Sequence, residues 1–263
     1  MTDRFRDVAE AAARQAGALL HAHFGTTQGV SYKGSPTNLV TEMDRRAEAL
    51  IVEAIRSRFP DHAILAEEAG ALAGSGAHRW IVDPLDGTTN YAHGLPVYSV
   101  SIALEVDGRL ALGVVYDPNR DECFVAERGR GAWLNGAPLR VSATDSLNLS
   151  LLSTGYPYNI REARDTNLAE HASLSLRCRS VRQLGSAVLD LVSVAAGRLD
   201  GFWALRLGPW DVAAGMLMVE EAGGRVTDLA GGPVDLAAPS AVASNGLIHD
   251  EILRALKDIS KGD

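Results

Sequence analysis

The sequence contains only two cysteines among its 263 residues, Cys123 and Cys178, and no CxxC pair. Two thiols so far apart do not form a disulfide framework or the thiolate cluster of a structural zinc site. We therefore predict two reduced cysteines that have no catalytic role.

Basic residues are also scarce. The 25 Lys and Arg residues against 33 Asp and Glu residues give a formal net charge of −8 at pH 7. This balance argues against a protein that binds nucleic acid through bulk charge. An acidic protein still binds an anionic substrate where bound cations or helix N-termini neutralise it locally.

Long hydrophobic runs and internal repeats are absent as well. The longest uncharged run, residues 87–104, contains Asn90, His93 and Pro96 and is therefore not a membrane span. Residues 1–24 mix charged and apolar side chains and lack the apolar core of a signal peptide. We expect a cytoplasmic protein without a membrane partner.

Hydrophobic periodicity predicts a mixed α+β chain with antiparallel hairpins in its middle, rather than a regular βαβ array. The predicted helices are residues 3–23, 42–59, 161–174, 186–196, 209–222 and 247–257. The predicted strands are residues 62–66, 80–82, 97–104, 110–116, 123–126, 132–134, 201–204, 225–227 and 241–244. Asp107-Gly108 and Asn135-Gly136 are the predicted tight turns.

The segment WIVDPLDGTTN, residues 80–90, places two carboxylates directly after an apolar strand. Asp83 and Asp86 are three residues apart, and the proline between them stiffens the turn so that both can face one point. Hard divalent ions such as Mg²⁺ prefer carboxylate and carbonyl oxygens. Asp83, Asp86 and the Leu85 carbonyl are therefore candidate metal ligands.

The residues that follow suit a phosphate. Gly87 lets the backbone approach a ligand closely. Thr88 and Thr89 are expected to cap a following helix, whose free N–H groups suit an anion. The alternative is an ordinary surface turn with helix capping.

Further acidic residues stand at the ends of other predicted elements. Glu67 and Glu68 follow the strand at 62–66, and Asp211 opens the helix at 209–222. Taken singly, Asp211 is more often an N-cap, and Glu67 with Glu68 a solvated loop pair. Acidic residues at three element ends together favour a cation site.

These segments resemble the two signature motifs of the inositol monophosphatase family, at residues 80–90 and at PWDVAAGMLMVEEAGG, residues 209–224. YKGSPTNLVTEMD and ILAEE match the family in order and spacing. The resemblance implies a layered α-β-α-β-α sugar-phosphatase fold, a homodimer, and Mg²⁺-dependent, often lithium-sensitive hydrolysis of phosphomonoesters. We expect one domain over residues 1–263, with two packed lobes of about residues 1–145 and 146–263.

The resemblance also implies roles for individual residues. Two to three Mg²⁺ ions are expected on Glu67, Asp83, the Leu85 carbonyl, Asp86 and Asp211, with Asp83 shared. Thr88 and Asp44 correspond to the pair that positions and deprotonates the attacking water, and Glu67 is counted with them as catalytic. The expected substrate contacts are Asp86, Gly87, Thr88, Gly185, Ser186, Ala187, Arg206 and Asp211, with Lys33 on a loop nearby.

Two positions depart from the family pattern, and Arg206 lies two residues after the first of them. Many members have a glutamate seven residues before the second-motif aspartate, where it accepts hydrogen bonds from ring hydroxyls, but here that position is Ala204. Arg206 either faces the pocket and binds an anionic group or lies in solvent. Asn38 stands where many members have aspartate.

The implied substrate is a small phosphorylated metabolite, with myo-inositol 1-phosphate first. Histidinol phosphate, fructose 1,6-bisphosphate and a nucleotide 3′-phosphate or NADP(H) phosphate stay open as alternatives. A different class is a partner protein in transcription antitermination and ribosomal RNA maturation. The sequence has no basic stripe for direct RNA contact.

Overall fold

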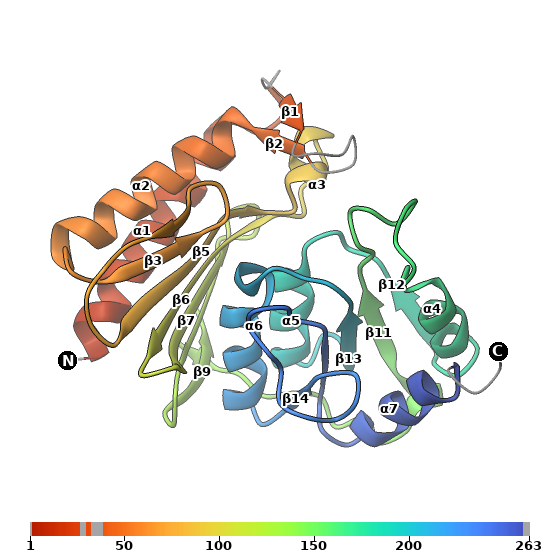
Figure 1. The fold of residues 1–263 in the computed structure, drawn as a ribbon. Coiled ribbons are helices and arrows are strands. Elements are labelled where there is room, and N and C mark those ends of the chain that lie inside the picture. The colour runs from red at the N-terminus through yellow and green to blue at the C-terminus, as the bar shows by residue number, and fades with distance from the viewer. Residues whose placement is uncertain (1, 27–29, 33–38, 260–263) are drawn as a thin grey trace.

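The computed structural model describes residues 2–26, 30–32 and 39–259 (Figure 1). The helices are α1 Thr2–His23, α2 Glu42–Arg58, α3 Thr88–Ala92, α4 Leu168–Ser175, α5 Ala187–Ala195, α6 Pro209–Glu221 and α7 His249–Lys257, with a 3₁₀ turn at Leu147–Leu149. The strands of the first half are β1 Val30–Tyr32, β2 Leu39–Thr41, β3 Ala63–Ala66, β4 Gly70–Leu72, β5 His78–Asp86, β6 Ser99–Val106, β7 Arg109–Asp117, β8 Glu122–Glu127, β9 Gly131–Leu134 and β10 Ala137–Pro138. Those of the second half are β11 Leu151–Thr154, β12 Ser180–Arg182, β13 Gly201–Ala204, β14 Arg225–Thr227 and β15 Ala241–Ser244.

Two large sheets organise the molecule. The first has eight strands in the order β10-β9-β8-β7-β6-β5-β3-β4, and all neighbours are antiparallel except the parallel pair β3 and β5. The second has five strands in the order β12-β11-β13-β15-β14, in which β11 runs parallel to both of its neighbours. β1 and β2 form a separate antiparallel pair.

The sheets alternate with three helical layers, which confirms the predicted α-β-α-β-α class. α1 and α2 cover one face of the first sheet, α5 and α6 lie between the two sheets, and α4 and α7 cover the outer face of the second (Figure 1). β5 shows why the first sheet needs helices on both faces. Trp80 and Val82 belong to the core under α1 and α2, whereas Ile81 belongs to the core under α5 and α6.

The central helices approach their neighbours closely because small residues stand at the contacts. A side chain at Gly215 of α6 would place its Cβ atom 2.5 Å from the Cβ atom of Leu191 in α5. A Cβ atom at Gly113 of β7 would lie 2.9 Å from the carbonyl oxygen of Ala214. Such contacts leave no room for a methyl group, so α6 is held tightly between α5 and the first sheet.

Most predicted elements are confirmed, including both tight turns and the strands at 201–204, 225–227 and 241–244. The predicted helix at 161–174 is wrong in its first half, because α4 begins only at Leu168. Asn167, just before it, has a left-handed backbone with φ of 66° and is fully buried. Its amide donates to Thr154 Oγ1 (2.7 Å) and its carbonyl oxygen accepts from Trp203 Nε1 (2.6 Å), so tertiary contacts override the helical pattern.

β4, β10, β11 and β12 were not predicted. β11 carries apolar and hydroxyl side chains on both faces and is buried along three of its four residues, so it shows no clear alternation. The division into two lobes near residue 145 stays a prediction. Among the residues that the structure describes, the helices lack the combined length and apolar character that a membrane crossing requires.

Candidate functional site

The C-terminal end of β5 brings two buried carboxylates to one side of the strand. Residues three apart in a regular strand face opposite sides. Here Asp83 pairs with Ser101 of β6 and Asp86 with Ser99, so β5 carries one extra residue between the pairs. This bulge bends the strand and turns both carboxylates toward the same point. The exposed fractions are 1% for Asp83 and 7% for Asp86.

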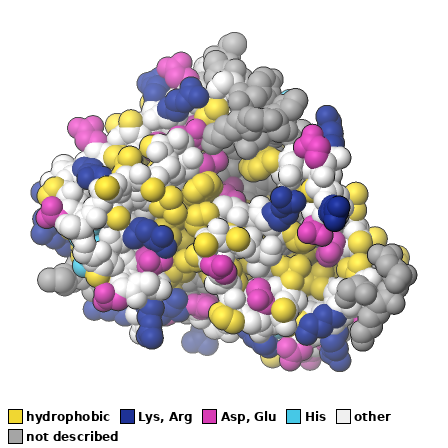
Figure 2. All heavy atoms as spheres, in the orientation of Figure 1, with side chains coloured by type: hydrophobic (Ala, Val, Ile, Leu, Met, Phe, Trp, Pro, Cys, Tyr) yellow, Lys and Arg dark blue, Asp and Glu magenta, His cyan; other side chains and the backbone are white. Residues whose placement is uncertain are grey.

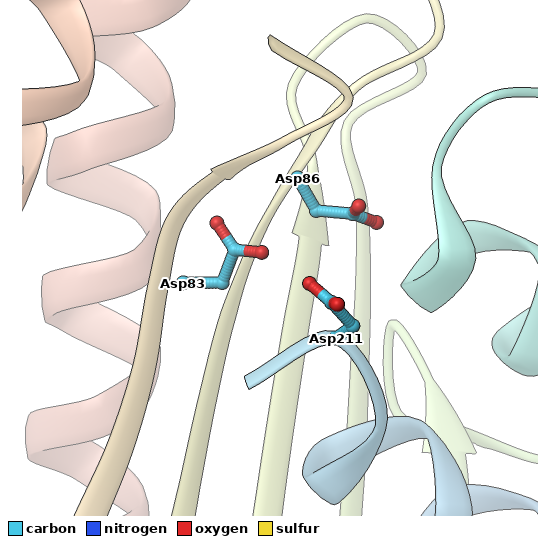
Figure 3. Close-up of side chains that lie close together, drawn as sticks. All are labelled: Asp83, Asp86 and Asp211. Atoms are coloured by element: carbon cyan, nitrogen blue, oxygen red, sulfur yellow. The ribbon is translucent and has the colours of Figure 1, made fainter. Parts of the chain in front are cut away.

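A third carboxylate arrives from the start of α6. Pro209 occupies the first turn, where its missing N–H costs nothing, and Asp211 follows at the third helical position. Asp211 Oδ2 accepts from the backbone N–H of Gly208 (2.6 Å), which fixes the side chain beside the helix N-terminus. Carboxylate oxygens of Asp83, Asp86 and Asp211 lie within 4.8 Å of one another and point into the same space (Figure 3). We call these three residues the carboxylate cluster.

The carboxylate cluster concentrates buried acidic groups at one place. Burial, followed by the charges of Glu67, Asp86 and Asp211, raises the pKa of Asp83 well above its usual range. Burial raises the pKa of Asp86 to about 6, although hydrogen bonds from Ser186 and Val188 oppose the shift. A divalent cation would relieve both effects, and a set of carboxylates with a neighbouring carbonyl suits Mg²⁺ chemically.

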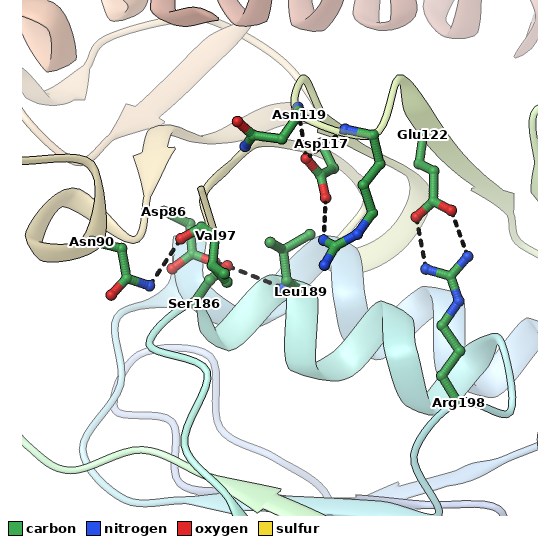
Figure 4. Close-up of polar contacts among 10 residues, drawn as sticks. Asp86, Asn90, Val97, Asp117, Asn119, Glu122, Ser186, Leu189 and Arg198 are labelled. Carbon is green, nitrogen blue, oxygen red and sulfur yellow. Dashed lines mark hydrogen bonds and ion pairs between the residues drawn. The ribbon is translucent and has the colours of Figure 1, made fainter. Parts of the chain in front are cut away.

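Asp86 is also held by the N-terminus of α5. Its Oδ2 atom accepts a short hydrogen bond from the Ser186 hydroxyl and another from the Val188 N–H (2.8 Å), and Oδ1 accepts from the Ala187 N–H (3.3 Å). Figure 4 shows Asp86 and Ser186 in contact, with the Ser186 side chain also capping Leu189. The helix therefore orients a carboxylate that lies 100 residues earlier in the chain.

Both ends of α5 are tied to the first half of the chain. Before its N-terminus, the Asn90 amide donates to the carbonyl oxygens of Val97 (2.9 Å) and Leu184 (2.8 Å). Beyond its C-terminus, the Arg198 guanidinium makes two hydrogen bonds of 2.6 and 2.5 Å to Glu122 (Figure 4). These contacts, none of which was predicted, hold α5 and hence Asp86 in place.

Asp44 and Thr88 form a second polar group beside the carboxylate cluster. Thr88 Oγ1 lies 3.0 Å from Asp44 Oδ1 and 3.0 Å from the carbonyl oxygen of Leu85. The other carboxylate oxygen of Asp44 accepts from the backbone N–H (2.8 Å) and the hydroxyl (2.5 Å) of Thr41, in a capping box at the start of α2. Burial raises the pKa of Asp44 to about 6, and hydrogen bonds from Thr41 and Thr88 oppose the shift.

The predicted capping of α3 by Thr88 and Thr89 is wrong. The N-cap of this five-residue helix is Gly87, which has φ of 94° and no capping side chain. A Cβ atom there would lie 2.8 Å from the carbonyl oxygen of Val97, so both the backbone angle and the space require glycine. The Thr88 hydroxyl does not cap α3 but donates a hydrogen bond to Asp44.

Glu67 lies at the edge of the same site. It is half-buried directly after β3, its N–H donates to the Val82 carbonyl oxygen (3.2 Å), and its charge raises the pKa of Asp83. The loop behind it is pinned by Glu48 of α2, whose carboxylate accepts from the N–H groups of Glu68 (2.8 Å) and Ala69 (2.9 Å). The sequence offered no signal for this role of Glu48.

A cavity of about 310 Å³ opens beside the carboxylate cluster. Asp86 and Asp211 line one end together with Gly87 and Thr88, and Gly185, Ser186 and Ala187 line the side next to α5. Much of the remaining lining is hydrophobic or aromatic, and we call these residues the apolar wall: Tyr156, Pro157, Tyr158, Ile160, Phe202, Ala204, Leu205 and Leu207. The pKa of Tyr158 is raised by burial and by the nearby charges of Asp211 and Glu67, so this hydroxyl lies close to the carboxylate cluster. The cavity therefore offers an anionic end for cations and phosphate and a less polar end for the rest of a substrate.

The comparisons with known proteins match this geometry. The sequence model of the inositol monophosphatase family matches residues 1–261 of the chain. An inositol-1-monophosphatase from Synechocystis sp. is 47% identical over 251 residues, which cover 95% of this chain and 88% of that protein. This chain belongs to the inositol monophosphatase family.

Other members of the inositol monophosphatase family are similar over nearly their whole length. The protein named Nus factor SuhB from Escherichia coli K12 is 44% identical, covering 96% of this chain and 95% of that one. The solved structure of inositol monophosphatase from Anabaena (Nostoc) sp. PCC 7120 superposes with a TM-score of 0.89 at 44% identity, covering 98% of this chain and 96% of that one. The resemblance inferred from the motifs is therefore confirmed.

Ala204, the departure from the family pattern that lies within the described residues, and the neighbouring Arg206 both line the cavity. Ala204, at the end of β13, is 1% exposed and lines the apolar wall. Arg206 is exposed, has φ of 58°, and is anchored by its own N–H to Ser240 Oγ (3.0 Å). Arg206 therefore both borders the cavity and contacts solvent. Lys33 and Asn38 lie outside the described residues.

The residues that line the cavity include three ionisable groups that we did not predict, Tyr156, Tyr158 and Asp190. Asp190 of α5 is 2% exposed and belongs to the cavity lining. It follows Ser186 by four residues, so both stand on the same face of the helix. That spacing was the one sequence signal that could have pointed to it.

Proposed function

We propose that this protein is a Mg²⁺-dependent phosphomonoesterase that releases phosphate from a small phosphorylated metabolite, with myo-inositol 1-phosphate as the first substrate. The observation that carries the proposal is the carboxylate cluster, whose oxygens lie within 4.8 Å of one another at one end of a substrate-sized cavity. Membership in the inositol monophosphatase family and relatives named inositol-1-monophosphatase support it.

The proposed ligands of Mg²⁺ are the carboxylate cluster, the Leu85 carbonyl oxygen and Glu67, with two to three ions per site. The donor set is entirely oxygen, as Mg²⁺ prefers, and burial raises the pKa values of Asp83 and Asp86, an effect that a bound cation would oppose. When bound, such ions screen a phosphate dianion and lower the pKa of an attacking water.

The protein residues position the water and the phosphate. The Thr88 hydroxyl donates to Asp44, so its lone pairs are left to accept a hydrogen bond from a water in the cavity. Asp44, with its pKa raised to about 6, is near the range in which a base is effective at neutral pH. The backbone N–H groups of Gly87 and Thr88 are proposed to bind the phosphate oxygens.

Phosphate release from a panel of substrates tests the proposal. The panel contains inositol 1-phosphate, histidinol phosphate, fructose 1,6-bisphosphate and a nucleotide 3′-phosphate, each with Mg²⁺, with Mg²⁺ plus Li⁺, and with EDTA. We expect Mg²⁺-dependent, Li⁺-sensitive turnover, fastest with inositol 1-phosphate. Preference for another member would keep the hydrolase and replace the substrate, whereas turnover in EDTA would contradict the metal site.

The second candidate function is that of a protein partner in transcription, because the 44% identical relative from E. coli is named Nus factor SuhB. On the face drawn in Figure 2, Lys and Arg side chains are interspersed with Asp and Glu rather than gathered into a stripe. Direct binding of RNA through bulk charge therefore has no support on this face. Asp83→Asn separates the two functions, since a partner role would survive the change and hydrolysis would not.

We also propose a homodimer, which the family resemblance supports. Sedimentation velocity at several protein concentrations tests it. A single species with the mass of one chain at every concentration would contradict it.

A further inference from the structure

Asp190 is a buried carboxyl group that the proposed chemistry does not use. It lies in the first half of α5 with an exposed fraction of 2%, and its Oδ1 atom has no hydrogen-bond partner among the residues that the structure describes. Leaving a buried polar atom unsatisfied costs about 1–3 kcal/mol. Native proteins rarely keep such an atom without a reason.

The position of Asp190 supplies a reason. Asp190 lines the cavity together with Phe202 and Ala204 of β13, and it lies near enough to Asp86 to feel the charge of that carboxylate. On α5 it stands one turn beyond Ser186, whose hydroxyl already donates to Asp86. α5 therefore carries Ser186, which bonds the carboxylate cluster, and, one helical turn further along the chain, Asp190, which lines the cavity.

The lining residues of β13 offer no polar side chain to a substrate. Phe202 and Ala204 have hydrocarbon side chains, and the Ser186 hydroxyl is engaged with Asp86. Rotation about the last torsion of an aspartate exchanges its two oxygens at low cost, because that torsion is broad and roughly two-fold. The acceptor that the protein leaves unused can thus face the cavity.

We propose that Asp190 is a specificity-determining residue that hydrogen-bonds a hydroxyl group on the alcohol part of the substrate. This inference rests on the proposed phosphomonoesterase function and adds to it one residue that contacts the alcohol part of the substrate.

The surroundings of Asp190 favour an uncharged hydroxyl over a cationic or anionic group. Burial raises the pKa of Asp190 well above its usual range, the nearby Ser153 side chain opposes the shift, and the charge of Asp86 adds to it. The Ser153 hydroxyl, like Asp190 Oδ1, has no hydrogen-bond partner among the described residues. A carboxyl group accepts a hydrogen bond from a hydroxyl in either protonation state, and its neutral form, which burial favours, does not repel the phosphate dianion.

Two substrates test the inference on the intact chain with Mg²⁺ present. Inositol 1-phosphate carries ring hydroxyls, whereas p-nitrophenyl phosphate has none. For Asp190→Ala we expect KM for inositol 1-phosphate to rise about tenfold at similar kcat, as expected for one lost hydrogen bond to a buried group. KM and kcat for p-nitrophenyl phosphate should change less than twofold. Asp190→Asn, which keeps an acceptor, should restore KM for inositol 1-phosphate to within about threefold.

A matched control separates this role from a structural one. Asp200 is also buried, but it lies outside the cavity lining and accepts from the Leu151 N–H (2.7 Å) and the Ser142 hydroxyl (2.6 Å). Asp200→Asn should lower the melting temperature without separating the two substrates. An unchanged KM for inositol 1-phosphate in folded Asp190→Ala, or an equal loss on both substrates, would overturn the inference.

The failure of the proposed function would be visible separately. If the wild-type protein releases phosphate from neither substrate, the phosphomonoesterase itself is wrong. If it hydrolyses both but the Asp190 variants do not distinguish them, only the role of Asp190 is wrong.

Discussion

The two ends of the cavity are built in different ways. The carboxylate cluster stands on the end of β5 and the start of α6, and Asp86 receives three hydrogen bonds from the N-terminus of α5. The apolar wall combines the end of β13 with residues 155–160, which belong to no helix or strand. The proposed metal ligands Asp86 and Asp211 thus stand on regular elements, whereas much of the apolar wall lies on loops, which change more readily.

The two ends also differ in charge and in energetic cost. At the acidic end, burial raises the pKa of Asp86, and burial with the charges of Glu67, Asp86 and Asp211 raises that of Asp83, so deprotonation of these buried carboxylates costs folding free energy. The apolar wall contains no carboxylate. Under the proposed function, changes at the acidic end should therefore affect every substrate, whereas changes at the wall should affect the choice of substrate.

The strongest test of this contrast is Asp211→Asn. It removes one charge from the carboxylate cluster while keeping the hydrogen-bonding shape, so we expect metal-dependent turnover of every substrate to fall about 10³-fold. Circular dichroism should show the fold retained. Asp250→Asn, on the exposed start of α7, is the matched control and should keep full activity. Near-normal turnover in Asp211→Asn would break the metal assignment.

Asp44→Asn tests the base beside the cluster. The amide can still accept from Thr88 but cannot take a proton, so kcat should fall about 100-fold with KM within about twofold. Steady-state phosphate release measures both constants. Glu42→Gln, an exposed change on the same helix, should leave them unaltered. A rise in KM at constant kcat would instead assign Asp44 to binding.

Glu67→Gln should have a smaller effect because Glu67 lies at the edge of the cluster. We expect the Mg²⁺ concentration for half-maximal activity to rise about tenfold and inhibition by Li⁺ to weaken. Glu53→Gln, exposed on α2, is the control. A Mg²⁺ titration that superposes on the wild-type curve would remove Glu67 from the ligands.

Ala204→Glu tests the role of the apolar wall. A carboxylate at this position of the apolar wall would add a hydrogen-bond acceptor for a substrate hydroxyl, so kcat/KM for inositol 1-phosphate should rise about three- to tenfold. Ala204→Leu fills the same space without an acceptor and should lower it. If Ala204→Glu leaves kcat/KM unaltered, the hydroxyls are held by other groups.

The smallest expected effect concerns pH. The pKa of Asp86 is about 6 in the folded protein against 3.8 ordinarily, so from about pH 4 to pH 6 the folded state retains a proton that the unfolded state has released. Stability of the metal-free protein therefore falls as pH rises through this range. Mg²⁺ requires the deprotonated carboxylates. The increase in melting temperature on adding Mg²⁺ should thus be several degrees larger at pH 8 than at pH 5.

Thermal melts in EDTA and in Mg²⁺ at both pH values measure this difference. Asp83→Asn is the reference variant, because it weakens the metal site and should reduce the gain at pH 8. An equal gain at both pH values would mean that Mg²⁺ acts elsewhere on the protein.

Much of the fold could be predicted because its elements follow local patterns. α6 begins at Pro209 and β13 covers residues 201–204, as the sequence indicated. The prediction of a helix before Leu168 was wrong because the Asn167 side chain accepts a hydrogen bond from Trp203, which is 36 residues away. β11 was missed because a strand buried on both faces lacks the alternation that identifies strands.

The sequence by itself determined which acids stand at the ends of elements, since strand and helix boundaries follow from side chains close in the chain. Only the tertiary structure decided that Asp86 is held by α5, that Thr88 meets Asp44, and that Asp190 lines the cavity. The reason is physical. Contacts between segments 44 to 100 residues apart depend on how the helical layers pack against the two sheets, and local propensity carries no information about that packing.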